Sequence, residues 1–309
     1  MDSVIIDNIE LFLAHKISSG AKWIGQNEPM RQILACWHTV ADDDIPLTPR
    51  IIGVPGIGKT TLAMAAAVEL DKDVYIMQCT SDTRPEDLLV TPVLSEKGKI
   101  SYHASPLLTA AITGDAAVLD EGNRMSEKSW ASLAGLLDNR RTVESVVAGI
   151  TVKAHKDFRA VVTMNDDSST YEIPDYIMSR LQPGIQVGFP DRSDEMRILS
   201  YNLPFCAGEV LDLCVDFLQK AHGYDLPYSV RDGINAIRYT LKRKAADPEA
   251  DTSELFKSSI SQILGKEALD LDALGMKRSL SAGKLPEMLM GDYFFSDDDP
   301  LNPDKDINA

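Results

Sequence analysis

Residues 53–61 read GVPGIGKTT and lie between the apolar pair Ile51-Ile52 and the alanine-rich stretch LAMAAAVEL. Glycine and proline disfavour the interiors of helices and strands, so a run this rich in both marks a loop between a short strand and a helix. The spacing fits G-x-x-x-x-G-K-[ST], in which the glycines let successive backbone N–H groups surround a phosphate. The sequence therefore predicts a nucleotide-binding loop.

The contacts expected from this loop divide between its backbone and two side chains. Lys59 is placed to reach the β- and γ-phosphates, and the Thr60 hydroxyl is placed to ligate Mg²⁺. The following helix would begin with its positive dipole end on the anion. The residues predicted to bind the nucleotide here are Gly53, Pro55, Gly56, Ile57, Gly58, Lys59, Thr60 and Thr61.

A second apolar run ends in two adjacent carboxylates, in the stretch AAVLDEGNR at 116–124. Asp120 at the strand tip is predicted to hold Mg²⁺. Glu121 points the other way along the pleat and would polarise a water towards the γ-phosphate. Asn165 ends a further strand pattern, where it either orients that water or caps the strand. These residues together predict hydrolysis of the nucleotide.

The composition limits the class of protein. Of the 309 residues, 44% are apolar and 25% charged, as in ordinary globular chains, and no apolar run approaches the ~20 residues of a membrane-spanning helix. The net charge of −16 argues against a surface that holds duplex DNA, although a local basic channel is compatible with it. The N-terminus lacks a signal-peptide pattern, so we expect a cytoplasmic protein. Four cysteines lack zinc or redox spacing and are expected to be reduced thiols: Cys36, Cys79, Cys206 and Cys214.

Strand and helix patterns alternate over residues 22–190, which predicts an α/β domain with a parallel sheet. Short runs rich in Val, Ile and Ala predict buried strands at 50–54, 73–78, 115–120 and 158–165. Helical patterns between them cover 60–70, 105–113 and 126–138. Hairpins are predicted at 93–103, turning at Lys97-Gly98, and at 142–153, turning near Ala148-Gly149.

Strand signals fade after Pro190, and residues 191–285 are predicted to form a small all-helical lid domain. Its helical patterns cover 192–202, 207–222, 229–245 and 252–270. Residues 1–21 are predicted to form an amphipathic N-terminal helix, and residues 286–309 an acidic tail.

The order of these motifs resembles that of the MoxR group of AAA+ ATPases, in the clade that inserts a hairpin into its second helix. GVPGIGKT matches the phosphate loop that MoxR proteins typically show, and LDEGNR is similar to their LDEINR. The resemblance covers about residues 22–245. It implies an AAA+ core with a helical lid, ATP as the nucleotide, and Mg²⁺-dependent hydrolysis. Trp23-Ile24-Gly25-Gln26 resembles the segment that packs near the adenine, so Ile24 and Gly25 are expected nucleotide contacts.

Two arginines gain roles from the same resemblance. PDYIMSRL at 174–181 resembles the segment whose arginine reaches into a neighbouring subunit, which implies that role for Arg180. YSVRD at 228–232 is similar to the motif that supplies a sensing arginine, here Arg231. Guanidinium groups stabilise charge on a transferring phosphoryl through bidentate hydrogen bonds. The residues alone equally allow ordinary ion pairs: Arg180 with Asp175 or Glu172, and Arg231 with Asp232.

The sequence also departs from the MoxR pattern. Gly122 replaces an isoleucine, Ala104-Ser105-Pro106 replaces His-Gly-Pro, and the run at 166–170 is shorter and more polar than usual. These departures leave the subfamily open. Arg124 is either an inter-subunit contact or an ordinary salt bridge.

The resemblance further implies a homo-oligomeric ring, hexameric as in related ATPases, that remodels a protein client, for which a von Willebrand factor A domain protein is a candidate partner. The two predicted hairpins would grip that client or are plain surface hairpins. The alternatives are a nucleic-acid motor, disfavoured by the acidic charge, and a nucleotide-gated scaffold, disfavoured by Glu121 and Arg180. A small-molecule kinase fits the carboxylate and asparagine series less well.

Overall fold

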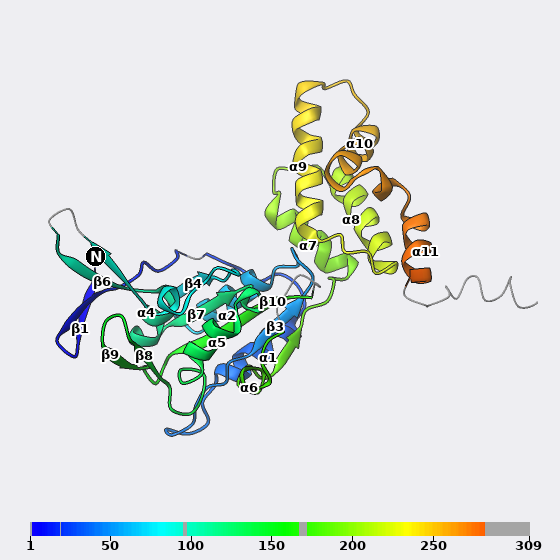
Figure 1. The fold of residues 1–309 in the computed structure, drawn as a ribbon. Coiled ribbons are helices and arrows are strands. Elements are labelled where there is room, and N and C mark those ends of the chain that lie inside the picture. The colour runs from blue at the N-terminus through cyan, green and yellow to red at the C-terminus, as the bar shows by residue number, and fades with distance from the viewer. Residues whose placement is uncertain (1, 19, 95–97, 167–171, 282–309) are drawn as a thin grey trace, which may run out of the picture. The chain divides into compact units, whose positions relative to one another are not determined.

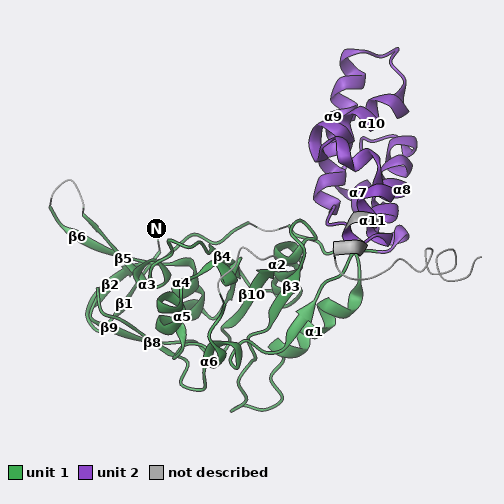
Figure 2. Ribbon diagram, turned by 45° about the vertical axis from the view of Figure 1, so that its right-hand side comes forward, with its two compact units in different colours: residues 1–190 green, residues 191–309 purple. Residues whose placement is uncertain are grey.

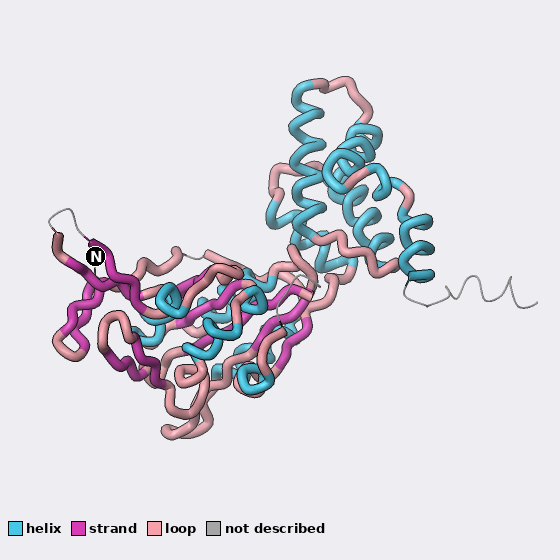
Figure 3. Tube along the Cα trace, viewed as in Figure 1, coloured by secondary structure: helices cyan, strands magenta, loops and turns pink. Residues whose placement is uncertain are grey.

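The structure is a computed structural model that describes residues 2–18, 20–94, 98–166 and 172–281. The chain divides into two compact units, residues 1–190 and 191–309, which are coloured separately in Figure 2. All described strands belong to the first unit, whereas the described elements of the second unit are helical (Figure 3). The predicted acidic tail at 286–309 lies outside the described residues.

The first unit is built on a five-stranded sheet in the order β11-β3-β10-β7-β4, with every neighbouring pair parallel (Figure 1). Its strands are β3 (Arg50–Gly53), β4 (Val74–Gln78), β7 (Ala116–Asp120), β10 (Arg159–Asn165) and β11 (Gly184–Gln186). The predicted α/β class is confirmed, and four strands lie where the sequence predicts them. Edge strand β11 was not predicted, because three residues carry too little periodicity to be recognised.

Helices cover both faces of this sheet, which explains why its strands are apolar on both sides. On one face, α1 (Asn27–Trp37) and α2 (Lys59–Glu69) contribute to a core that includes Val161 of β10. On the other, α4 (Pro106–Thr113) and α5 (Glu127–Leu133) contribute to a core that includes Val162. Successive side chains of β10 thus point into the two cores in turn. The polar side chains of the site lie at the ends of the strands.

A four-stranded sheet in the order β1-β2-β6-β5 lies beside this core. Its strands are β1 (Ser3–Ile6), β2 (Ile9–Phe12), β5 (Val90–Leu94) and β6 (Ile100–Ala104). The predicted N-terminal helix at 1–21 is therefore wrong: Asp7 and Asn8 take φ values of 49° and 65°, which make a two-residue hairpin turn, and β2 pairs in parallel with β6. The hairpin predicted at 93–103 is confirmed as β5 and β6, although part of its turn, 95–97, lies outside the described residues.

Three short helices and one hairpin complete the first unit. The hairpin pairs β8 (Thr142–Ser145) with β9 (Ile150–Lys153), as predicted, and Gly149 in its turn has a φ of 64°. The short helices are α3 (Pro85–Leu88), η1 (Gly122–Arg124) and α6 (Asp175–Met178).

The second unit contains α7 (Arg192–Asn202), α8 (Gly208–Gly223), α9 (Val230–Ala246), α10 (Thr252–Leu264), η2 (Lys266–Leu269) and α11 (Leu271–Ser281). Side-chain caps start several of them: the carboxylates of Asp191 and Asp251 accept backbone N–H groups of α7 and α10. The helix predicted at 252–270 breaks at Gly265, whose φ of 95° suits glycine, and α11 was not predicted. Along the described stretches, no helix has both the length and the apolarity to cross a membrane.

Candidate active site

The phosphate loop joins the end of β3 to the start of α2. Its three glycines lie where a side chain would clash with a neighbour or would be disfavoured by the backbone conformation. Gly56 and Gly58 have φ values of 82° and 99°, in the left-handed region. A Cβ on Gly53 would lie 2.6 Å from the carbonyl oxygen of Val187. Of the other predicted loop residues, Ile57 is buried in the core, Thr61 is half-buried on α2, and Pro55 is exposed. The backbone therefore has the form that a phosphate cradle requires.

Lys59, the first residue of α2, is 6% exposed and points back into the loop. Its Nζ donates to the carbonyl oxygens of Gly53 and Val54, at 2.9 Å each, and to Oδ1 of Asn165 at 2.8 Å. The structure thus joins the loop lysine directly to the asparagine at the end of β10. Both were predicted site residues.

Asp120, at the end of β7, accepts hydrogen bonds from two hydroxyl groups on one carboxylate oxygen. Thr60 Oγ1 donates to Oδ1 at 2.6 Å, and Thr163 Oγ1 donates to it at 2.7 Å. A hydroxyl beside a carboxylate is an oxygen donor set that suits Mg²⁺ bound together with phosphates. No group of three or more Asp, Glu, His or Cys side chains that could together hold a metal ion occurs in the described part of the chain. The two predicted metal ligands, Thr60 and Asp120, are brought together as expected.

Glu121 follows in a left-handed conformation, with a φ of 56°, that turns its side chain towards β10. Its Oε1 accepts a hydrogen bond from Asn165 Nδ2 at 3.0 Å. Its Oε2 lies 2.6 Å from Nε of Arg124, one turn further along. Of the two alternatives for Arg124, the structure therefore shows the salt bridge within the chain.

Thr163 links the two carboxylate residues and was not predicted. Besides donating to Asp120, its hydroxyl accepts the backbone N–H of Glu121 at 2.9 Å. Asn123, also not predicted, donates from Nδ2 to the carbonyl oxygen of Asn165 at 2.8 Å. Thr163 lies inside a buried strand, so only the parallel pairing of β10 with β7 reveals that it faces Asp120.

The departure at Gly122 has a steric cause. A Cβ there would lie 2.4 Å from Cγ1 of Val162 and 3.2 Å from the ring of Trp130. Cys79, which follows β4, is unsuited to nucleophilic catalysis, because burial and the carboxylates of Asp120 and Glu121 raise the pKa of its thiol to about 12. All four cysteines are free thiols, as predicted.

The segment expected near the adenine lies against the phosphate loop. The Trp23 ring would be 3.3 Å from a Cβ on Gly58, and Trp23 Nε1 donates to the carbonyl oxygen of Gln26 at 2.8 Å. Gln26 Nε2 in turn donates to the carbonyl oxygen of Phe189 at 3.1 Å. Ile24 is half-buried within this tied segment, and Gly25 has a φ of 142°.

Arg180 lies just after α6, apart from the hydrogen bonds that join Lys59, Asn165 and Glu121. Its guanidinium donates to the carbonyl oxygen of Tyr176 and lies 3.5 Å from Oδ2 of Asp138. The ion pairs considered for it, with Asp175 or Glu172, are not formed among the described residues.

Arg231 is exposed in the first turn of α9, in the second unit. Asp232 accepts hydrogen bonds from the backbone and hydroxyl of Ser229, both at 2.8 Å, and so closes the cap of α9. Asp232 therefore caps the helix instead of forming the ion pair considered for Arg231.

Comparison with known proteins identifies the family to which the first unit is related. Residues 50–181 match the AAA domain family of the dynein-related subfamily. The first unit contains a MoxR-type AAA+ domain. Protein CbbQ of Hydrogenophilus thermoluteolus is 30% identical over 113 residues, which cover 37% of this chain and 42% of that protein. The relationship predicted from the motifs is thereby confirmed.

Two further matches have lower sequence identity to this AAA+ chain. The uncharacterized protein YeaC of Bacillus subtilis (strain 168) is 27% identical over 171 residues, which cover 54% of this chain and 48% of YeaC. The chain thus spans less than half the length of these two curated relatives. The structure of the RuvB Holliday junction branch migration motor of Thermotoga maritima superposes with a TM-score of 0.55 at 13% identity, covering 87% of this chain and 80% of RuvB, which shows a shared fold.

Proposed function

We propose that this AAA+ protein hydrolyses ATP with Mg²⁺ and uses the cycle to remodel a protein partner. The observation that carries the proposal is the continuous network at the strand ends, in which Lys59, Asn165 and Glu121 form one chain of hydrogen bonds. Thr60, Asp120 and Thr163 form the other. This adjacency supports the proposed roles of these groups as phosphate cradle, metal-binding pair and water-activating carboxylate, which hydrolysis requires side by side.

Each residue has a defined task in this proposal. The loop backbone and the Lys59 ammonium hold the triphosphate, and Asn165 fixes the direction of the Glu121 carboxylate. Glu121 accepts a proton from the attacking water. Thr60 and Asp120 would hold Mg²⁺, which when bound withdraws charge from the β- and γ-phosphate oxygens. Thr163 keeps both carboxylate residues in register.

We further propose that Arg180 acts on the nucleotide of an adjacent subunit in a homo-oligomeric ring, taken to be hexameric. Support comes from its position outside the network that holds its own subunit's Glu121. Arg231, on the helical unit, is proposed as the sensing arginine. Both assignments derive from the MoxR-type motifs.

The protein partner is proposed from the hairpins and from the family. Exposed apolar side chains gather near the two hairpin turns: Leu94 is 70% exposed, Ile100 60% and Val146 92%. Such residues favour contact with an unfolded or loosely packed polypeptide. A von Willebrand factor A domain partner is a family-based candidate. The free thiols fit a reducing compartment, and on that ground we propose a cytoplasmic location.

The test is a mixture of two inactive variants. Glu121→Gln should bind ATP normally and lower kcat by at least about 100-fold, because the amide cannot take the proton. Arg180→Ala should be similarly slow with its own Lys59 and Glu121 intact. Mixed, the two should recover activity at interfaces where an intact Glu121 faces an intact Arg180. An unchanged kcat for Glu121→Gln would refute the hydrolysis site; no recovery in mixtures would refute the shared one.

A nucleic-acid motor is the second candidate, favoured by the fold shared with the RuvB branch migration motor. The net charge of −16 opposes it. Stimulation of the ATPase by duplex DNA at about 50 mM salt, lost at about 200 mM, would favour this candidate over a protein client.

A further inference from the structure

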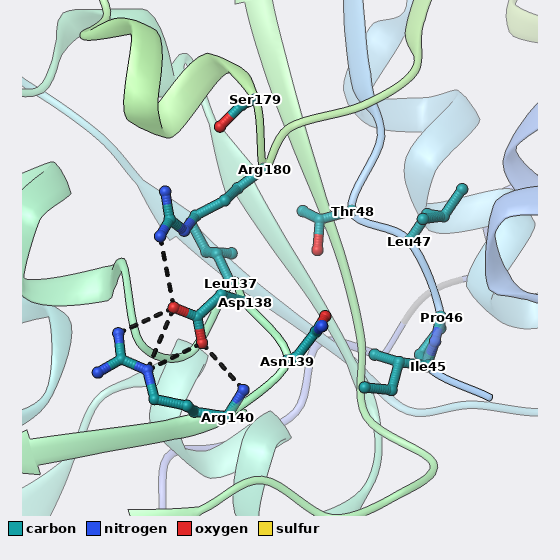
Figure 4. Close-up of a pocket in the computed structure, with 10 residues that line it drawn as sticks. All are labelled: Ile45, Pro46, Leu47, Thr48, Leu137, Asp138, Asn139, Arg140, Ser179 and Arg180. Atoms are coloured by element: carbon teal, nitrogen blue, oxygen red, sulfur yellow. Dashed lines mark hydrogen bonds and ion pairs between the residues drawn. The ribbon is translucent and has the colours of Figure 1, made fainter. Parts of the chain in front are cut away.

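Arg180 opens into a pocket of about 550 Å³ within the first unit, and the pocket contains a second arginine (Figure 4). Residues 45–48 form one wall, residues 137–140 another, and Ser179 and Arg180 the third. Arg140 and Arg180 both point at Asp138, which is the acidic residue among those described as lining the pocket. Two guanidinium groups therefore share one carboxylate in this pocket, in a chain whose net charge is −16.

Asp138 holds the two arginines unequally. Arg140 Nη2 donates to Oδ2 at 2.8 Å, its Nε lies 3.2 Å from each carboxylate oxygen, and its backbone N–H donates to Oδ1 at 2.9 Å. Nη2 of Arg180 is 3.5 Å from Oδ2. One carboxylate cannot satisfy two planar guanidinium forks. Arg180 also donates from Nη1 to the carbonyl oxygen of Tyr176, so its Nη2, which is held weakly by Asp138, is the group that retains donor capacity for another anion.

The pocket is also open to such an anion. The Arg140 side chain is 68% exposed and the Arg180 side chain 28%. The facing wall, Ile45 to Thr48, carries an aliphatic surface and one hydroxyl, and no charge. Arg140 hydrogen bonds hold the pKa of Asp138 down at about 2, with Arg180 adding to the effect, so this carboxylate keeps the site organised at any physiological pH.

We propose that this pocket receives the γ-phosphate of ATP bound to the adjacent subunit, that Arg140 is a second guanidinium acting on it, and that Asp138 positions both arginines. The inference rests on the proposed function of Arg180. Three terminal oxygens of a γ-phosphoryl group can accept from two forks at once, which one carboxylate does not.

In the step, the water oxygen bonds to the γ-phosphorus as the bond to the β–γ bridging oxygen breaks. The water's proton passes to Glu121 of the subunit that holds the nucleotide, and the bridging oxygen's electron pair remains on ADP. Arg140 and Arg180 donate N–H groups to the oxygens on which charge accumulates. Because this charge is greatest in the transition state, losing Arg140 should lower kcat more than it raises KM.

Arg140→Ala in the full chain should lower kcat at saturating ATP about tenfold or more, with KM changed less than about threefold. Arg140→Lys should recover part of the loss, since it restores charge and not the fork. Lys156→Ala is the matched control: its exposed side chain carries the same charge in the same unit, and it should leave kcat unchanged. An unchanged kcat for Arg140→Ala would overturn the proposal.

Mixing separates action across subunits from a structural role. Arg140→Ala mixed with Glu121→Gln should regain turnover, since about a quarter of the interfaces in a randomly mixed ring then pair an intact Glu121 with an intact Arg140. Arg140→Ala mixed with Arg180→Ala should regain none, because both defects lie in the donated pocket.

The outcomes also separate this inference from the proposed function. Recovery with Arg180→Ala plus Glu121→Gln, but not with Arg140→Ala plus Glu121→Gln, overturns only the role of Arg140. Recovery with neither overturns the shared site itself. Loss of binding to a fluorescent DNA duplex in Arg140→Ala, without loss of kcat, would assign the pocket to nucleic-acid phosphates and overturn the proposal.

Discussion

Two polar regions of the AAA+ unit differ in how firmly they are built. Around the phosphate loop, Lys59, Asp120 and Glu121 each have at least two partners within the chain, and the strand ends bury much of the network. In the pocket of Arg180, a single carboxylate contacts two arginines, whose side chains are 68% exposed for Arg140 and 28% exposed for Arg180. A single chain thus preorganises the groups that we propose to bind and cleave the nucleotide, whereas the two arginines that we propose to act across subunits share one carboxylate.

Among variants that test this contrast, Lys59→Ala should lower turnover the most. It removes an almost buried ammonium with three hydrogen bonds, one of them to Asn165. We expect turnover to fall at least about 1000-fold, since the γ-phosphate loses its fixed charge and Asn165 its partner. Steady-state ATPase assays and calorimetric ATP titration measure it, with Lys156→Ala as the control. Wild-type turnover in Lys59→Ala would refute the assignment of the phosphate loop.

Thr163→Val should have the next largest effect. Valine keeps the volume but lacks the hydroxyl that donates to Asp120 and accepts from Glu121. We expect kcat to fall by about 10- to 100-fold and the free energy of unfolding by about 1–3 kcal/mol, since a buried N–H loses its acceptor. Thr163→Ser restores the hydroxyl and should restore kcat. If Thr163→Ser and Thr163→Val were equally impaired, packing and not the hydrogen bond would explain the loss.

Asp138→Asn should have the smallest effect, because asparagine still accepts from the Arg140 backbone while losing the charge that holds the side chains. We expect kcat to fall about three- to tenfold. The folded-state pKa of about 2 lies below the ordinary value for Asp, so the contribution of this charge is present above about pH 4 and lost as pH falls towards 2. The ratio of wild-type to variant kcat should therefore stay constant from about pH 5 to pH 8. A ratio that changes across that range would mean that another titrating group positions the arginines.

The sequence predicts the phosphate loop and the central strands well because their signals are local. Gly53, Lys59 and Asp120 belong to motifs whose spacing alone implies the geometry, and the apolar runs of β3, β7 and β10 are continuous. The N-terminal hairpin was mispredicted, since VIIDNIELFL has apolar residues at spacings that also suit a helix. The turn chemistry of Asp7-Asn8 and the parallel pairing with β6 decide it, and the second of these is a contact over about 90 residues.

Thr163 and Asp138 could not be found in the same way. Neither belongs to a recognised motif, and each contacts the proposed site only through a partner on another element: Asp120 on β7 for Thr163, and Arg180 after α6 for Asp138. The resemblance predicts Arg180 itself. The sequence suggests Glu172 and Asp175 as its acidic partners because they lie near it, but its carboxylate partner is 42 residues earlier.

Val162 of β10 occupies the space in which a side chain at position 122 would stand: a Cβ there would lie 2.4 Å from Val162 Cγ1, with the Trp130 ring next at 3.2 Å. Positions 122 and 162 consequently cannot vary independently. Any residue larger than glycine at position 122 would have to displace Val162 or the backbone next to Glu121, and would therefore move the carboxylate that we propose as the base. A buried valine of the central sheet thereby limits how the backbone beside the proposed base can be built.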